Sequence, residues 1–136
     1  QQHRPENFWN PAMQAHPNGA RRFSSVTMVA GDPADHAEFL SAFTGIRAFS
    51  ATSAGLRFET PRGVVECLSD AAFAFDFGLS AIGEGPRLAA FTIAVDDLAA
   101  LEARLTSEDF TCLKHQGALI VPPQNAFGVA LRFVAV

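Results

Sequence analysis

The sequence predicts an α+β domain built from two copies of a βαβββ unit. The segment from Phe23 to Asp32 alternates bulky apolar and small polar residues, as a half-buried strand does, and ends in a residue that can begin a helix. A segment with the same pattern runs from Leu88 to Asp97, 65 positions later. The chain has 136 residues, of which 49% are hydrophobic, so it is long enough to bury a core. A long repeat that occurs only twice indicates duplication of one supersecondary unit.

A helix is predicted after each of these segments. Asp32 suits the N-cap of the first helix, Pro33 suits its first turn, and Gly45 marks its end. In the second helix, apolar residues recur at helical spacing, at Leu98, Leu101 and Leu105. Each helix is therefore expected to pack its apolar stripe on the bulky residues of its own module.

Three short strands are predicted after each helix, and turn residues such as Ala54-Gly55 and Gln116-Gly117 separate them. In the first half these strands are residues 46–52, 56–60 and 63–68. In the second half they are residues 110–115, 118–122 and 128–135.

We divide the chain into a lead-in, residues 1–22, and a domain, residues 23–136. The domain consists of module one (23–69), a connector (70–86) and module two (87–136). The lead-in lacks apolar periodicity, but its large apolar residues are expected to dock on the domain or on a neighbouring domain that is missing: Phe8, Trp9 and Met13. The chain begins without Met, so we expect a fragment or a processed product.

The composition argues against several classes of protein. The net charge is −4, whereas a nucleic-acid binder needs clustered Lys and Arg. The basic pair Arg21-Arg22 is interpreted as the solvent-exposed start of a strand. No apolar run approaches the roughly 20 residues of a membrane helix, and no signal peptide is visible. Cys67 and Cys112 are interpreted as buried thiols of a cytoplasmic protein, since no CxxC motif accompanies them.

Strand alternation also predicts which side chains face away from the helices. In the first strand of each module, small and polar residues alternate with bulky apolar ones, and the last strands divide in the same way. A curved sheet turns its helix-free side into a concave face. That face is expected to display Ser25, Thr27, Glu66, Ala90, Thr92 and Arg132.

Paired βαβββ modules with outer helices resemble the vicinal oxygen chelate superfamily, which includes glyoxalases, extradiol dioxygenases and bleomycin-resistance proteins. Three short motifs resemble those of one narrower group, the glyoxalase-like domain proteins of bacteria. They are His16–Ala20, Thr60–Gly63 and Gly128–Leu131. The resemblance covers residues 16–136 and implies that this chain is the C-terminal portion of a longer protein. It also implies a cleft between the modules that holds a small-molecule ligand.

Enzymes of this superfamily usually hold a divalent metal with four side chains, from the first and last strand of each module. Matched by strand position, this sequence offers Ser25, Glu66, Ala90 and Arg132, of which only Glu66 could be a ligand. We therefore predict neither a metal nor another cofactor. The histidines do not supply a replacement: His36 and His115 are interpreted as surface residues, and His16 either stabilises a turn or contacts a ligand.

The leading hypothesis is a metal-free glyoxalase-like domain that binds a small anionic or mixed apolar ligand. Its predicted ligand-binding residues are Ser25, Thr27, Arg57, Glu66, Thr92 and Arg132. Arg132 is expected to lie near Glu66 in place of the metal and to hold its carboxylate in a two-bond fork, or, with Arg57, to receive an anionic ligand.

Two alternatives stay open. The first is an active metal-dependent lyase or isomerase, similar to lactoylglutathione lyase, whose missing ligands come from another segment or chain. The second is a structural half-domain whose catalytic partner lies in an absent N-terminal region. Catalysis itself is left undecided. Exposed sheet edges predict a homodimer.

Overall fold

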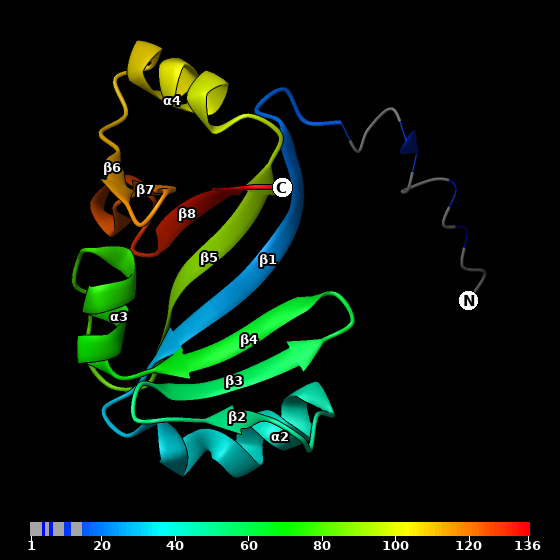
Figure 1. The fold of residues 1–136 in the computed structure, drawn as a ribbon, viewed down its shortest axis with the longest axis vertical. Coiled ribbons are helices and arrows are strands. Elements are labelled where there is room, and N and C mark those ends of the chain that lie inside the picture. The colour runs from blue at the N-terminus through cyan, green and yellow to red at the C-terminus, as the bar shows by residue number, and fades with distance from the viewer. Residues whose placement is uncertain (1–3, 5, 7–9, 12–14) are drawn as a thin grey trace.

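A computed structural model of the chain describes residues 4, 6, 10, 11 and 15–136 (Figure 1). Phe8, Trp9 and Met13 lie outside the described residues, and so does the prediction that they dock on the domain. From residue 20 onward the chain alternates strands and helices in the order that two βαβββ units require.

Module one consists of β1 (Ala20–Val29), a short 3-10 helix η2 (Pro33–His36), α2 (Ala37–Thr44), β2 (Ser50–Ala51), β3 (Gly55–Thr60) and β4 (Gly63–Leu68). Helix α3 (Asp70–Phe77) links the modules. Module two consists of β5 (Arg87–Val95), α4 (Leu98–Ser107), β6 (Leu113–His115), β7 (Ala118–Val121), the 3-10 helix η3 (Pro123–Asn125) and β8 (Ala130–Ala135). None of these helices has the length and apolar character that crossing a membrane would demand.

The strands form one mixed sheet in the order β2-β3-β4-β1-β5-β8-β7-β6. Within each module the first and last strands pair in parallel, β1 with β4 and β5 with β8. The two modules meet where β1 and β5 pair antiparallel, as two units related by a twofold axis would. The predicted fold class, α+β with two βαβββ modules, is confirmed.

The sheet is strongly curved, with α2 and α4 at its two ends and α3 on the open side between the modules (Figure 1). Leu40 of α2 packs with Leu56, Phe58 and Cys67, and Leu101 of α4 packs with Phe133 and its neighbours. The predicted caps are present: the side chain of Asp32 accepts a hydrogen bond from the backbone N of Ala34, and Gly45 ends α2 in the left-handed conformation.

The connector is more ordered than its sequence suggested, because residues 70–77 form α3. The side chain of Ser69 accepts a hydrogen bond from the backbone N of Ala72, and Gly78 ends the helix with a φ of 68°. Phe73 and Phe77 are fully buried, and their rings stack 4.4 Å apart. A cap residue, a glycine stop and two Phe four residues apart were the available signals, so the omission of this helix was an error of interpretation.

The outer strands are shorter than predicted. Of residues 46–52 only Ser50 and Ala51 pair as β2, and of residues 110–115 only Leu113–His115 pair as β6. β1, by contrast, begins at Ala20, where the side chain of Asn18 accepts a hydrogen bond from the backbone N of Ala20. Short outer strands offer little edge for pairing with another chain. The homodimer therefore stays a prediction, with less support from the sheet edges than the sequence implied.

Candidate functional site

The floor of the candidate site is a buried carboxylate on β4. Glu66 lies beside Thr27 of β1 in the parallel register, and its side chain is 10% exposed. The Thr27 hydroxyl donates a hydrogen bond of 2.7 Å to Glu66 Oε1, and Thr27 itself is fully buried. Both residues face the open side of the sheet, as strand alternation predicted.

Module two repeats this arrangement with the opposite charge. Thr92 of β5 lies beside Arg132 of β8 in the parallel register. Arg132 Nε donates a hydrogen bond of 2.9 Å to Thr92 Oγ1, and Thr92 is buried. Glu66 and Arg132 thus occupy equivalent places in the two modules, each next to a threonine on the first strand.

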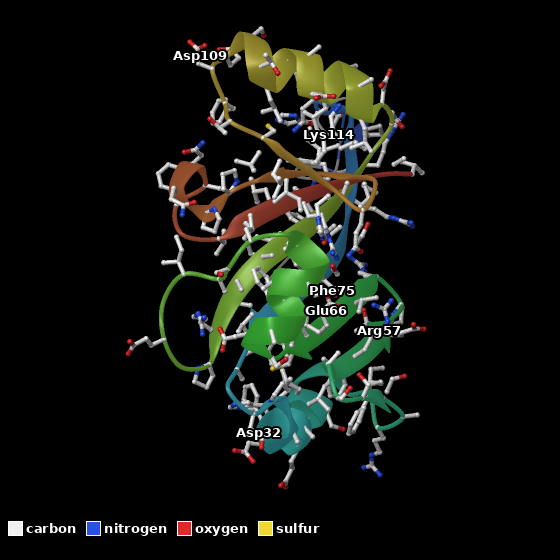
Figure 2. The ribbon with its side chains drawn as sticks, turned by 60° about the vertical axis from the view of Figure 1, so that its left-hand side comes forward. Asp32, Arg57, Glu66, Phe75, Asp109 and Lys114 are labelled. Atoms are coloured by element: carbon white, nitrogen blue, oxygen red, sulfur yellow. The ribbon has the colours of Figure 1, made fainter. Side chains whose placement is uncertain are left out.

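Two guanidinium groups flank the Glu66 carboxylate. Arg57 Nη1 lies 3.5 Å from Glu66 Oε2, and Arg132 Nη2 lies 3.9 Å from Glu66 Oε1. Figure 2 shows Arg57 and Glu66 next to each other on module one. Arg57 is shared, because its Nε lies 3.4 Å from Oε1 of the exposed Glu59. Arg132 lies near Glu66, as predicted, but the two do not form a fork of parallel hydrogen bonds, since 3.9 Å is longer than a hydrogen bond and Arg132 directs Nε to Thr92 instead.

Helix α3 completes the surroundings of Arg132. The guanidinium carbon lies 4.2 Å from the centre of the Phe77 ring, which is a cation–π distance. Burial lowers the pKa of Arg132, whereas the charges of Glu66 and Asp76 raise it and Arg57 lowers it further. Arg132 remains a cation under these opposing effects, because an arginine is protonated at any physiological pH. Sequence reasoning missed Phe77 and Asp76 because it missed the helix that carries them.

Ser25 contributes an unused hydroxyl. It lies opposite Thr92 in the antiparallel β1–β5 register and is 8% exposed. Its Oγ is buried and has no hydrogen-bond partner within the part of the chain that the structure describes. A buried hydroxyl without a partner is costly, so this atom is a candidate contact for a bound molecule.

The donor set does not fit a divalent metal. Among the described residues, no group of three or more His, Cys, Asp or Glu side chains converges. At the positions that the superfamily uses, Ala90 has no donor atom, Arg132 is a cation, and only Glu66 offers an anionic oxygen.

His16 and His115 take part in local hydrogen bonds. His16 Nδ1 accepts a hydrogen bond of 3.3 Å from the backbone N of Asn18, which matches the turn-stabilising interpretation. His115 is partly exposed at the surface, and its Nε2 lies 2.7 Å from the backbone oxygen of Phe75 on α3, a contact that the sequence did not indicate. His36 is likewise half-buried at the end of η2. Of the two free cysteines, Cys67 is buried as predicted, but Cys112 is only half-buried.

This architecture is the glyoxalase-like fold of the vicinal oxygen chelate superfamily, to which methylmalonyl-CoA epimerase belongs. The epimerase from Mycobacterium tuberculosis has 16% sequence identity to this chain, with a TM-score of 0.61, and the match covers 89% of this chain and 91% of the epimerase. A hypothetical protein from Bacillus halodurans has 14% identity and a TM-score of 0.59, and the match covers 85% of this chain and 94% of that protein.

A Streptomyces coelicolor epimerase variant in complex with 2-nitronate-propionyl-CoA has 16% identity and a TM-score of 0.57, with 84% of this chain and 93% of the variant covered. At these identities the likeness shows the fold alone. No known family model matches the sequence, and no curated protein matches it. The expected longer protein with an N-terminal domain stays a prediction.

Proposed function

We propose that this chain binds a small anionic ligand with an apolar part at the concave face, and that Arg57 and Arg132 receive the anion. The observation that carries the proposal is the pair of guanidinium groups at 3.5 Å and 3.9 Å from one buried carboxylate. Glu66 is shared between the two cations, and Arg57 also pairs with the exposed Glu59 at 3.4 Å, so an incoming anion competes with these carboxylates for the guanidinium groups. The Arg57 and Arg132 side chains are 49% and 21% exposed, so both are within reach of a ligand while remaining held in place.

The chemistry of the surrounding residues supports this choice. A guanidinium group binds carboxylates and phosphates through a planar fork of N–H donors. The unpartnered hydroxyl of Ser25 offers a further neutral contact on the same face. Phe77, Ala90 and Ala130 are fully buried beneath these polar residues and form a packed apolar floor. The exposed guanidinium groups, rather than this floor, are the part of the site that a ligand can reach.

The structural neighbours suggest which ligand class to test first. Solved epimerase structures contain methylmalonyl-CoA or 2-nitronate-propionyl-CoA, and both of these ligands carry an anionic group on a short acyl chain. We therefore propose acyl thioesters of dicarboxylic acids as candidate ligands. The methylmalonyl thioester of N-acetylcysteamine is the sharpest probe, because the propionyl thioester differs from it only by the carboxylate.

The test is calorimetric titration of both thioesters into the protein and its Arg132→Met and Arg57→Met variants. We expect the methylmalonyl thioester to bind at least tenfold more tightly than the propionyl thioester, and Arg132→Met to remove that preference. Arg47→Met, which removes an exposed arginine outside the site, is the matched control. Equal affinity for the two thioesters in the wild-type protein would contradict the proposal.

The metal-dependent lyase or isomerase is tested separately. We expect purified protein to contain less than stoichiometric divalent metal by elemental analysis, and added Mn²⁺, Ni²⁺ or Zn²⁺ not to tighten thioester binding. A stoichiometric metal whose retention is lost in Glu66→Gln would support the lyase instead.

A further inference from the structure

Arg57 has two carboxylate partners, and they differ in how firmly each is held. Arg57 lies directly opposite Glu66 in the antiparallel β3–β4 register, and its Nη1 is 3.5 Å from Glu66 Oε2. Glu59 lies two positions further along β3, so its side chain points to the same face of the sheet as Arg57. Arg57 Nε is 3.4 Å from Glu59 Oε1. One guanidinium group thus meets one carboxylate through Nη1 and another through Nε.

Glu66 is fixed in place. Its side chain is 10% exposed, and the Thr27 hydroxyl donates a hydrogen bond of 2.7 Å to its Oε1. The Arg132 guanidinium lies near the same oxygen, so the carboxylate has neighbours at both of its oxygen atoms. Moving Glu66 away from Arg57 would leave a nearly buried carboxylate short of partners, which is costly.

Glu59 is held much less firmly. Its side chain is 77% exposed, and Arg57 is its only hydrogen-bond or ion-pair partner among the residues that the structure describes. A distance of 3.4 Å is long for a hydrogen bond, and exposed ion pairs contribute little to stability. Glu59 can therefore turn into solvent at little cost.

From this difference we infer that Glu59 is a built-in competitor of the ligand: an incoming carboxylate displaces Glu59 from Arg57, whereas Glu66 stays in place. The inference rests on the proposed binding of an anion at the concave face and adds which contact gives way. Arg57 Nη1 keeps Glu66, and the Nε edge of the guanidinium turns from Glu59 to the ligand, where two parallel N–H donors can hold a carboxylate.

Such a competitor determines which ligands reach Arg57. A carboxylate accepts charge-assisted hydrogen bonds, which are about twice as strong as those that a neutral acyl group accepts, so only the anion displaces Glu59. The Glu59 carboxylate thus lowers the affinity for anions and leaves the affinity for neutral analogues unchanged.

The experiment titrates the methylmalonyl and propionyl thioesters of N-acetylcysteamine into the wild-type protein and into Glu59→Gln by calorimetry. We expect Glu59→Gln to bind the methylmalonyl thioester about threefold more tightly, in keeping with the modest strength of exposed ion pairs, and the propionyl thioester as the wild type does. Glu38→Gln, which removes the same charge from the exposed surface of α2, is the matched control and should change neither affinity.

Two further variants test whether Glu59 acts through its contact with Arg57. Glu59→Asp keeps the charge but is one methylene shorter, so it should bind the methylmalonyl thioester as tightly as Glu59→Gln does. In an Arg57→Met background, Glu59→Gln should have no effect. Wild-type affinity in Glu59→Asp, or a gain that persists without Arg57, would overturn the inference, because Glu59 would then act by repulsion at a distance.

The contact can also be measured without a ligand. Phenylglyoxal modifies guanidinium groups, and peptide mass spectrometry should show Arg57 reacting at least about twofold faster in Glu59→Gln than in the wild type, with Arg47 unchanged. An unchanged Arg57 rate would overturn the inference. Binding of the methylmalonyl thioester that Glu59→Gln leaves unaltered would overturn the inference alone, whereas no binding by the wild type or any variant would overturn the proposed function together with it.

Discussion

Thr27 and Thr92 occupy equivalent places in the two modules and use their hydroxyl groups in opposite senses. Thr27 donates its hydroxyl to Glu66 at 2.7 Å, whereas Thr92 accepts from Arg132 Nε at 2.9 Å. A hydroxyl can do either, because it carries one donor and two acceptor lone pairs. One duplicated framework thus holds an anion on one module and a cation on the other.

This relationship predicts unequal costs for the same substitution. Thr27→Val removes the hydroxyl that bonds a nearly buried carboxylate, and we expect the free energy of unfolding to fall by about 1.5–3 kcal/mol, as for hydrogen bonds to charged groups. Thr92→Val should cost about 1 kcal/mol, because the Arg132 side chain is 21% exposed and Glu66 only 10%. Urea unfolding followed by circular dichroism measures both values. A larger loss in Thr92→Val than in Thr27→Val would show that the Glu66 hydrogen bond is not the stronger constraint.

Helix α3 predicts a second contrast, between two aromatic residues two positions apart. Phe77 is fully buried against the sheet and lies under the Arg132 guanidinium, whereas Phe75 is 73% exposed. Phe77→Ala should lower the free energy of unfolding by about 3–5 kcal/mol through the cavity it leaves. Phe75→Ala, on the same helix, should change it by no more than about 0.5 kcal/mol.

The readout is again urea unfolding, with Phe77→Leu as the variant that preserves most of the packing. If Phe77→Ala unfolds at the same urea concentration as Phe75→Ala, α3 is not packed on the sheet as described.

Much of this fold could be predicted because the chain repeats itself. Two segments, one ending at Asp32 and its repeat ending at Asp97, each contain a strand pattern followed by a helix cap. Strand alternation then assigns the side chains to the two faces of the sheet. Helix α3 has the cap residue Ser69 and the stop residue Gly78, but it is only eight residues long and its amphipathic pattern is weak, so these local signals were overlooked. Its stability comes from burying Phe73 and Phe77 against strands distant in the sequence. Contacts between residues so far apart in the sequence cannot be read from a local sequence pattern.

Part of the candidate site could also be predicted from the internal repeat. The place of Glu66 and Arg132 follows from the repeat and from alternation. The direction in which Arg132 points does not, because it depends on the hydroxyl of Thr92 and the ring of Phe77 on other elements. The sharing of Arg57 between Glu59 and Glu66 likewise depends on side-chain conformation rather than on pattern.

The two thiols should differ in accessibility. Burial raises the pKa of Cys67, and its side chain has no exposed surface. Burial also raises the pKa of Cys112, with a further contribution from the charge of Glu102, but this residue is only half-buried. Raised pKa values mean less thiolate at neutral pH, so labelling of the partly accessible Cys112 should speed up as the pH rises.

With an aromatic disulfide reagent at pH 8, we expect Cys67→Ser protein, which keeps Cys112, to react within minutes. Cys112→Ser protein, which keeps Cys67, should react only as fast as the chain unfolds. Equal labelling rates in the two variants would show that Cys67 is open to solvent in the folded state.

A last prediction concerns the close approach of β3 and β4. Gly55 has a φ of +149°, and a Cβ built on it would lie 2.0 Å from the backbone oxygen of Cys67. Gly55→Ala therefore has to push apart two paired strands, and we expect a loss of at least about 3 kcal/mol in the free energy of unfolding, or failure to fold. Gly117→Ala is the matched control, because Gly117 also has a positive φ, +77°, but its added Cβ would meet nothing within 4 Å. That variant should lose only the cost of a left-handed alanine, about 1–2 kcal/mol. Urea midpoints of the two variants compare the effects directly, and equal midpoints would mean that β3 and β4 are not held as closely at Gly55 as described.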